Sequence, residues 1–305
     1  MPRPTNKTII NKYLDYITDS IQSQKMRKSS LAYFLEAKYF NYSGHVFDID
    51  TTILLDYHNY LKKLKDISLQ TKKNKWSILT SFLNFTMEYY HRFNFIVVIP
   101  SKTVNWNGNH KLAKTNKNTI ITPGEIEKLL EYFRQGNFKH YVIFRLFVET
   151  GVRKGELIKA KLSNVNFEYR HIKIEDGKTG LKYYEFTKGF SQKLQLYVRM
   201  RKGLDVKYDH LFLTKLFKPY GTRTFNIILE RACEQIGIEK NITTHTFRRS
   251  INTHRKKLKK CPNEVCKRLL GHKTRDVNEA SYTVYDFEDL VSLYDQYNPY
   301  ENLNL

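Results

Sequence analysis

Apolar residues recur at helical spacing in the first third of the chain. One such stripe runs from Ile9 to Ile17, and a second amphipathic stretch covers residues 46–64. A third stripe consists of Trp76, Leu79, Leu83, Phe85 and Tyr89. Residues 1–99 are therefore predicted to form a domain of helices joined by short loops.

Residues 100–119 carry no such pattern. From Pro100 to Lys111 the stretch is polar, aperiodic and poor in residues that could build a core. This composition is typical of a linker between two domains.

The pattern resumes at residue 120 and predicts a second domain over residues 120–305. Thr122, Pro123 and Glu125 form a helix-start signature with a capping box, and apolar residues follow at helical spacing as far as Phe133. Further helices are predicted over residues 141–150, 192–201, 224–236 and 245–258.

Residues 163–187 have a different texture, with β-forming residues in short runs. Asp176-Gly177 and Thr179-Gly180 separate two of these runs, which predicts a small antiparallel sheet with a hairpin tip near Lys178. The predicted fold class is therefore mainly α with a small antiparallel β-sheet.

The charge balance bears on partners. The chain has 52 Lys and Arg against 30 Asp and Glu, a net charge of +22, and the excess is spread over both halves. A spread excess favours a nucleic acid over a membrane surface or an ordinary basic protein such as a ribosome-associated one. A lysine cluster between the second and third stripes, including Lys72, Lys73 and Lys75, is predicted to contact a DNA backbone.

Three cysteines, Cys233, Cys261 and Cys266, form no pair with zinc spacing, so no metal site is predicted. Their sparse use fits a reducing compartment. The first residues lack the apolar core of a signal peptide, and no apolar run is long enough to span a bilayer. We therefore expect a soluble, cytoplasmic protein.

Five residues of the second domain have the chemistry to handle a phosphate ester: Arg153, His245, Arg248, His272 and Tyr282. Arginine matches two phosphate oxygens with a planar fork of donors. Histidine exchanges a proton near neutral pH, and tyrosine can form a covalent phosphoester. Arg248 follows His245 by three positions, so both belong to one helical face.

The order of these motifs resembles the tyrosine recombinase (phage integrase) family over roughly residues 120–290. The motifs are Gly-Val-Arg-Lys-Gly-Glu-Leu at 151–157, a hairpin lysine, His-Thr-Phe-Arg at 245–248, Leu-Leu-Gly-His at 269–272, and a tyrosine. The resemblance implies a helical core-binding domain joined to a catalytic domain, together forming a C-shaped clamp around double-stranded DNA. The length is similar to that of compact Xer-like or mobile-element members.

The resemblance also implies roles for these residues. Arg153 and Arg248 would clamp the scissile phosphate, with His245 assisting proton transfer and His272 donating to a non-bridging oxygen. Lys178 best matches the hairpin lysine that protonates the leaving oxygen. Lys182 is the alternative candidate for this role, and if it does not fill the role it is interpreted as a DNA contact. Arg249 stands where the family commonly has histidine and is interpreted as a DNA-backbone contact.

Tyr282 is the best candidate for the nucleophile, and Tyr285 is the alternative. The distance from His272 to Tyr282 is one residue longer than is usual in the family, and some divergent members use a distance like that of Tyr285.

The implied activity is site-specific recombination through a 3′-phosphotyrosyl intermediate and a Holliday junction. It would take place within a homo-tetramer on paired DNA sites and need no metal or other cofactor. A type IB topoisomerase-like nicking and closing enzyme and a catalytically silent DNA-binding protein are the alternatives. Beyond Tyr285 an acidic segment carries an apolar stripe from Phe287 to Tyr294. By the same resemblance this stripe would dock on a neighbouring subunit.

Overall fold

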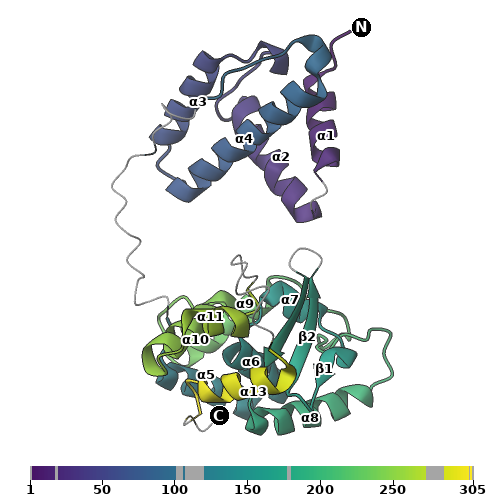
Figure 1. Cartoon of the computed structure of the whole chain (residues 1–305), viewed down its shortest axis with the longest axis vertical. Helices are drawn as coiled ribbons and strands as arrows, with labels where there is room; N and C mark the ends of the chain where they lie inside the picture. The colour runs from purple at the N-terminus through teal and green to yellow at the C-terminus, as the bar shows by residue number, and fades with distance from the viewer. Residues whose placement is uncertain are drawn as a thin grey trace. The chain divides into compact units, whose positions relative to one another are not determined.

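The structure is a computed structural model that describes residues 2–17, 20–100, 106, 120–176, 180–272, 285–301 and 303. The chain divides into two compact units, residues 1–112 and 113–305 (Figure 1). Each unit has its own hydrophobic core. Within the described part, no helix is both long enough and apolar enough to cross a bilayer.

The first unit is built from helices that pack on α4. These are α1 (Asn6–Tyr16), α2 (Ile21–Leu35), α3 (Thr51–Lys63) and α4 (Leu69–Tyr89), with short 3-10 turns η1 (Val46–Asp48) and η2 (His91–Phe93). Each α-helix begins at a Thr, Ser or Asp whose side chain accepts a hydrogen bond from the first turn. The amphipathic stretch predicted over residues 46–64 is two elements, because Asp50 caps a new helix.

The predicted linker, residues 100–119, lies almost wholly outside the described residues. Of its interior only Trp106 is described, and its ring meets that of His58 on α3 edge-on at 4.5 Å. This tryptophan therefore packs against the core of the first unit.

A buried central helix organises the second unit. This helix, α6 (Phe138–Thr150), is buried at every position from Tyr141 to Thr150 and contacts α5 (Pro123–Gly136), α8 (Lys188–Lys202) and α10 (Thr244–Leu258). The capping box predicted at the start of α5 is present, with Thr122 and Glu125 bonded to each other's backbone N–H. α6 ends at Gly151, whose φ of +63° favours glycine.

A three-stranded antiparallel sheet packs beside these helices. β1 (Val165–Asn166) follows α7 (Lys154–Lys159) and η4 (Leu162–Asn164), and pairs with β2 (His171–Asp176). β2 pairs with β3 (Gly180–Glu185) in a register that runs from His171 opposite Glu185 to Asp176 opposite Gly180. The fold class predicted from the sequence, mainly α with a small antiparallel sheet, is therefore confirmed.

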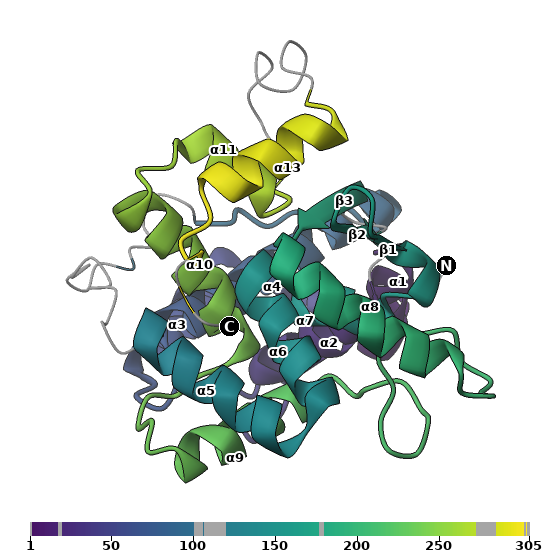
Figure 2. The same ribbon diagram turned by 90° about the horizontal axis from the view of Figure 1, so that it is seen from below.

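The remaining helices are α9 (Thr224–Gln235), α11 (Asn263–Leu269) and α13 (Phe287–Gln296). Figure 2 shows α13 lying beside α11, and α13 also contacts β3. The side chain of Tyr294 is 1% exposed and Leu290 is buried. In this single chain the apolar stripe therefore packs on its own domain.

Candidate active site

Arg248 lies at the centre of the candidate site. It lies in the first turns of α10, is 5% exposed, and donates hydrogen bonds to the carbonyl oxygens of Gly151 at 2.7 Å and Leu270 at 2.5 Å. A guanidinium has five N–H donors, and these bonds use two. Arg248 thus joins three segments that are far apart in sequence.

Close packing explains the glycine at the end of α6. A side chain at Gly151 would meet Ile251 and Leu270 at 3.0 Å and the backbone of Arg248 at 3.3 Å. The chain then enters α7, and Arg153 is the N-cap residue of that helix. This geometry brings Arg153 and Arg248 together, and each lies within electrostatic range of the other.

Arg153 is held by the carboxylate of Glu156, which belongs to the same Gly-Val-Arg-Lys-Gly-Glu-Leu motif. Its backbone N–H donates to Glu156 Oε2 and its Nη1 to Oε1, both at 3.0 Å. The Arg153 side chain is 42% exposed, whereas that of Glu156 is 6% exposed. The buried carboxylate therefore orients an arginine whose guanidinium still reaches solvent.

Glu156 also accepts hydrogen bonds from β3. Lys182 Nζ forms a buried ion pair with Oε1, and the Tyr184 hydroxyl donates to Oε2 at 2.8 Å. Burial alone would raise the pKa of the Glu156 carboxyl, but the donors Lys182, Tyr184 and Arg153 hold that pKa below its ordinary value. Glu156 is therefore ionised at neutral pH.

Two histidines, His245 and His272, lie within electrostatic range of both arginines. Asn226 on α9 accepts from the backbone N–H and hydroxyl of Thr244, which fixes the first turn of α10 next to His245. His272 follows Gly271, whose φ is +59°. Partial burial lowers the pKa of both imidazoles. Repulsion from Arg248 and Arg153 lowers both further, and for His245 the repulsion from Arg249 is larger still. Both are thus neutral at pH 7, able to accept at one ring nitrogen and donate at the other.

The candidate DNA contacts differ in how far their side chains are exposed to solvent. Arg249 is exposed on α10, and Lys72 and Lys73 are half-buried on α4. Lys75 is 7% exposed with its Nζ 3.1 Å from the centre of the Tyr33 ring, and Lys182 is 4% exposed. Lys75 and Lys182 are therefore placed inside the protein, because a cation–π contact and an ion pair hold their ammonium groups.

Two predicted residues, Lys178 and Tyr282, lie outside the described residues. Tyr285, the alternative nucleophile, is described, and the Arg268 guanidinium lies over its ring at 5.2 Å.

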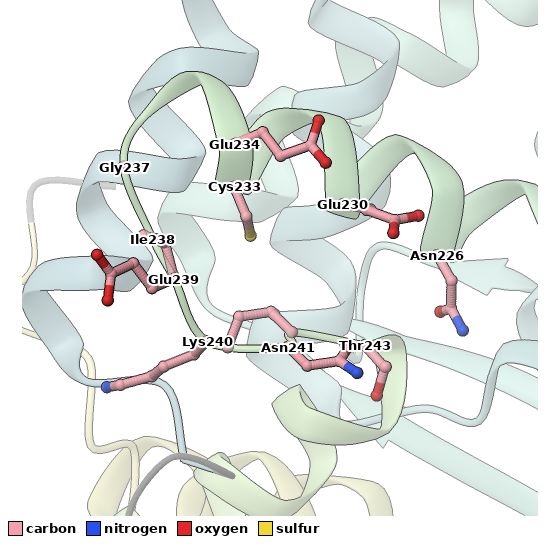
Figure 3. A pocket seen from close by; sticks show the side chains of 11 residues that line it. Asn226, Glu230, Cys233, Glu234, Gly237, Ile238, Glu239, Lys240, Asn241 and Thr243 are labelled. Carbon is pink, nitrogen blue, oxygen red and sulfur yellow. The ribbon is translucent and has the colours of Figure 1, made fainter.

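Two cavities adjoin this region. One of about 260 Å³ is lined by Arg153, Gly155, Glu156, Lys159 and Glu175, next to the exposed arginine. Another of about 650 Å³ lies between the end of α9 and the start of α10 (Figure 3). Its lining includes Glu230, Glu234 and Glu239, and such an acidic wall disfavours a phosphate. The arginine side of α10 is therefore the candidate site.

The family model described as the phage integrase family matches residues 119–288, more than half of the chain. The chain belongs to the phage integrase family. It is accordingly an enzyme that breaks and rejoins DNA.

Curated relatives agree with this membership. The tyrosine recombinase XerC of Leptospira interrogans is 23% identical over 301 residues, which cover 95% of this chain and 92% of that protein. A tyrosine recombinase of Pseudothermotoga lettingae is 27% identical over 237 residues, covering 77% of this chain and 79% of that protein.

Solved structures share the fold. XerH recombinase in a post-cleavage complex with its palindromic difH substrate has a TM-score of 0.66 at 19% identity, covering 94% of this chain and 83% of that one. The Tn1549 transposon integrase with circular intermediate DNA has a TM-score of 0.63 at 17% identity, with coverages of 95% and 99%. A lambda integrase tetramer bound to a Holliday junction has a TM-score of 0.62 at 16% identity, with coverages of 93% and 81%.

Glu156 and Tyr184 are the site residues that sequence reasoning missed. Glu156 follows Arg153 by three positions at a helix start, which is a capping-box spacing that could have drawn attention to it. Nothing in the sequence pairs Tyr184 with Glu156, because that contact depends on how α7 packs against the sheet.

Proposed function

We propose that this member of the phage integrase family is a site-specific recombinase that exchanges DNA strands through a 3′-phosphotyrosyl intermediate. The observation that carries the proposal is the pair of arginines joined through Gly151, one buried and one partly exposed, with two neutral histidines within electrostatic range of both. Such a set of donors suits a phosphorane, whose added negative charge needs fixed donors in the transition state.

In this mechanism Tyr282 attacks the scissile phosphorus in line and forms the phosphotyrosyl bond while the bond to the 5′ oxygen breaks. Arg153 and Arg248 stabilise the extra charge, and His272 donates to a non-bridging oxygen. His245 accepts the tyrosine proton, which its neutral imidazole allows. Lys178 gives a proton to the leaving 5′ oxygen. A 5′ hydroxyl from the partner strand then reverses these steps, so the number of phosphodiester bonds is conserved.

The proposed DNA contacts are Lys72, Lys73 and Arg249. Lys75 and Lys182, which were also predicted as contacts, are left out because their ammonium groups are buried. We further propose that residues 1–99 form the core-binding domain, residues 120–305 the catalytic domain, and residues 100–119 the linker. Four copies would assemble on paired sites and pass through a Holliday junction. The lambda integrase tetramer on such a junction, which shares this fold, supports that assembly.

Covalent capture tests the proposal. The protein is incubated with a library of nicked duplexes of random sequence, in which the cleaved strand loses a short fragment and cannot be rejoined. Denaturant-resistant adducts should form on a defined sequence, and Tyr282→Phe should bind DNA yet form none. Adducts that persist in Tyr282→Phe but vanish in Tyr285→Phe would move the nucleophile to Tyr285. The absence of any adduct with the unmodified protein would refute the proposed function.

A further inference from the structure

Lys182 stands out as a buried ion-pair partner at the edge of the candidate site. Its side chain is 3% exposed and its ammonium is paired with Glu156. A side chain at Gly271 would meet Lys182 Cδ at 3.0 Å and Cγ at 3.3 Å, so the stem lies directly beneath the Gly271–His272 turn. Packed in this way, the ammonium is not placed to contact a DNA backbone.

The charges around Glu156 decide what Lys182 can do. The carboxylate is nearly buried and meets two cationic groups, Lys182 Nζ and the Arg153 guanidinium. One negative charge can offset only one of them. Lys182 is buried with the carboxylate, whereas the Arg153 side chain is 42% exposed. The attraction between Lys182 and Glu156 is therefore less screened by water, and Lys182 neutralises most of the negative charge of Glu156.

We propose that Lys182 is the charge partner of Glu156, and that this pairing leaves Arg153 with its full positive charge for the phosphate. The inference rests on the proposed function of Arg153. Lys182 acts here as a positioning residue through Glu156, and it touches neither the DNA nor the reacting atoms. Without its charge, Glu156 would be neutralised by Arg153, and the arginine would attract a phosphate less strongly.

Tyr184 supports this arrangement. Its hydroxyl donates to Glu156 Oε2 at 2.8 Å, which leaves Oε1 to be shared by Lys182 and Arg153. The carboxylate is thereby fixed in an orientation that serves both cations. Replacing the lysine with a neutral residue of similar length should therefore alter the charge balance more than the geometry.

The test compares Lys182→Gln with the double variant Lys182→Gln/Glu156→Gln. Glutamine removes the charge at each position and keeps a hydrogen-bonding amide, which at position 182 is one bond shorter in reach than the lysine ammonium. Single-turnover cleavage of nicked DNA at saturating protein should fall about tenfold or more in Lys182→Gln and recover to within about threefold of wild type in the double variant. Lys182→Arg should retain most of the activity. Lys139→Gln is the matched control, since the Lys139 ammonium donates to the Leu213 carbonyl oxygen at 2.8 Å rather than to a carboxylate.

Three outcomes would overturn the inference. A double variant as slow as Lys182→Gln would mean that the lysine acts independently of Glu156. Recovery of Lys182→Gln on DNA with a 5′-phosphorothiolate would make Lys182 the general acid, because a sulfur leaving group needs no proton. A loss of DNA affinity that matches the loss of cleavage would make it a DNA contact.

A second measurement does not depend on cleavage. Binding of inorganic phosphate, followed by the side-chain NMR signal of Arg153, should weaken severalfold in Lys182→Gln and recover in the double variant. If wild type forms no covalent adduct yet phosphate binding follows this pattern, the proposed function fails and the charge pairing stands. Equal phosphate affinity in wild type and Lys182→Gln would refute the charge pairing.

Discussion

Arg248 on α10 donates a 2.7 Å hydrogen bond to the carbonyl oxygen of Gly151, two residues before Arg153. Arg248 therefore fixes the backbone from which Arg153 projects. Because Arg248 is 5% exposed and also donates to Leu270, its guanidinium has a structural role in addition to any role toward a phosphate.

The two arginines should consequently respond differently to truncation. Arg248→Ala would leave two buried carbonyl oxygens without a donor, so we expect it to lower the free energy of unfolding by about 2–4 kcal/mol. Arg153→Ala removes a partly exposed side chain and should change that free energy by less than about 1 kcal/mol, while cleavage falls about a hundredfold or more. Urea unfolding and adduct formation measure both effects. Equal destabilisation by the two variants would contradict this division of roles.

The C-terminal helix offers a second test. Tyr294 on α13 donates to Glu149 Oε2 at 2.5 Å, and Glu149 also holds Arg145 and Thr187. Tyr294→Phe should destabilise the second unit by about 1–2 kcal/mol, because a buried carboxylate loses a donor. Native-state hydrogen exchange of α6 and α8 amides measures this change. Tyr297→Phe, on a less buried residue just after α13, is the control.

The same contact bears on assembly. Asp295 on α13 pairs with Arg170 at 2.5 Å, and Phe287 packs against the rings of Tyr169, His171 and Tyr183. Docking of α13 on a neighbouring subunit would require these contacts to break. We therefore expect Tyr294→Phe, which weakens them, to leave single-site DNA binding intact and to favour the paired-site complex in a native gel. A smaller amount of the paired-site complex in this variant than in wild type would argue that α13 acts in its own subunit.

Much of the fold could be predicted from local signals. The capping box at Thr122 and the β-forming runs near Lys178 correctly indicated α5 and the sheet. Helix α2 gave no comparable signal, because its apolar residues do not form a stripe, and only Ser30, Leu31 and Phe34 of this helix are buried. Its position is set by packing against α4, which a sequence pattern does not reveal.

The candidate site could be predicted only in part, because motifs are local in sequence whereas the burial of a side chain depends on tertiary packing. Motif order selected Arg153, His245, Arg248 and His272 as candidates, and the structure places both histidines within electrostatic range of both arginines. The environment of a lysine was not predictable, because burial of Lys75 depends on the Tyr33 ring and burial of Lys182 on Glu156. Both partners are more than 20 residues away in sequence, so only the tertiary structure separates these two lysines from the remaining candidate contacts.

Salt dependence of DNA binding should distinguish these lysines. Lys72→Ala and Lys73→Ala should each reduce the log–log slope of affinity against salt by about 1, the value for one phosphate contact. Lys75→Met should leave the slope unchanged, since its ammonium lies over the Tyr33 ring and displaces no counterion from DNA. Titrations at several salt concentrations measure the slope. A reduction of similar size for Lys75→Met would show that the ammonium leaves the ring to reach DNA.

Acid stability should depend on His171, which is buried at the start of β2 between aromatic rings. Burial lowers the pKa of His171 to about 4 in the folded protein, against about 6.5 when unfolded. Between these values the unfolded chain binds a proton that the folded chain does not, so stability is lost as pH falls from 6.5 to 4 and changes no further below that.

This histidine should account for at most about 3 kcal/mol of that loss. His171→Phe keeps an aromatic ring and should flatten the pH dependence by a similar amount, measured by hydrogen exchange of the β2 and β3 amides at pH 7 and pH 4. Tryptophan fluorescence is an internal control, because both tryptophans, Trp76 and Trp106, lie in the first unit. At each pH the fluorescence should therefore be the same in His171→Phe as in wild type. An unchanged pH dependence in His171→Phe would show that this imidazole is protonated as readily in the folded protein as in the unfolded chain.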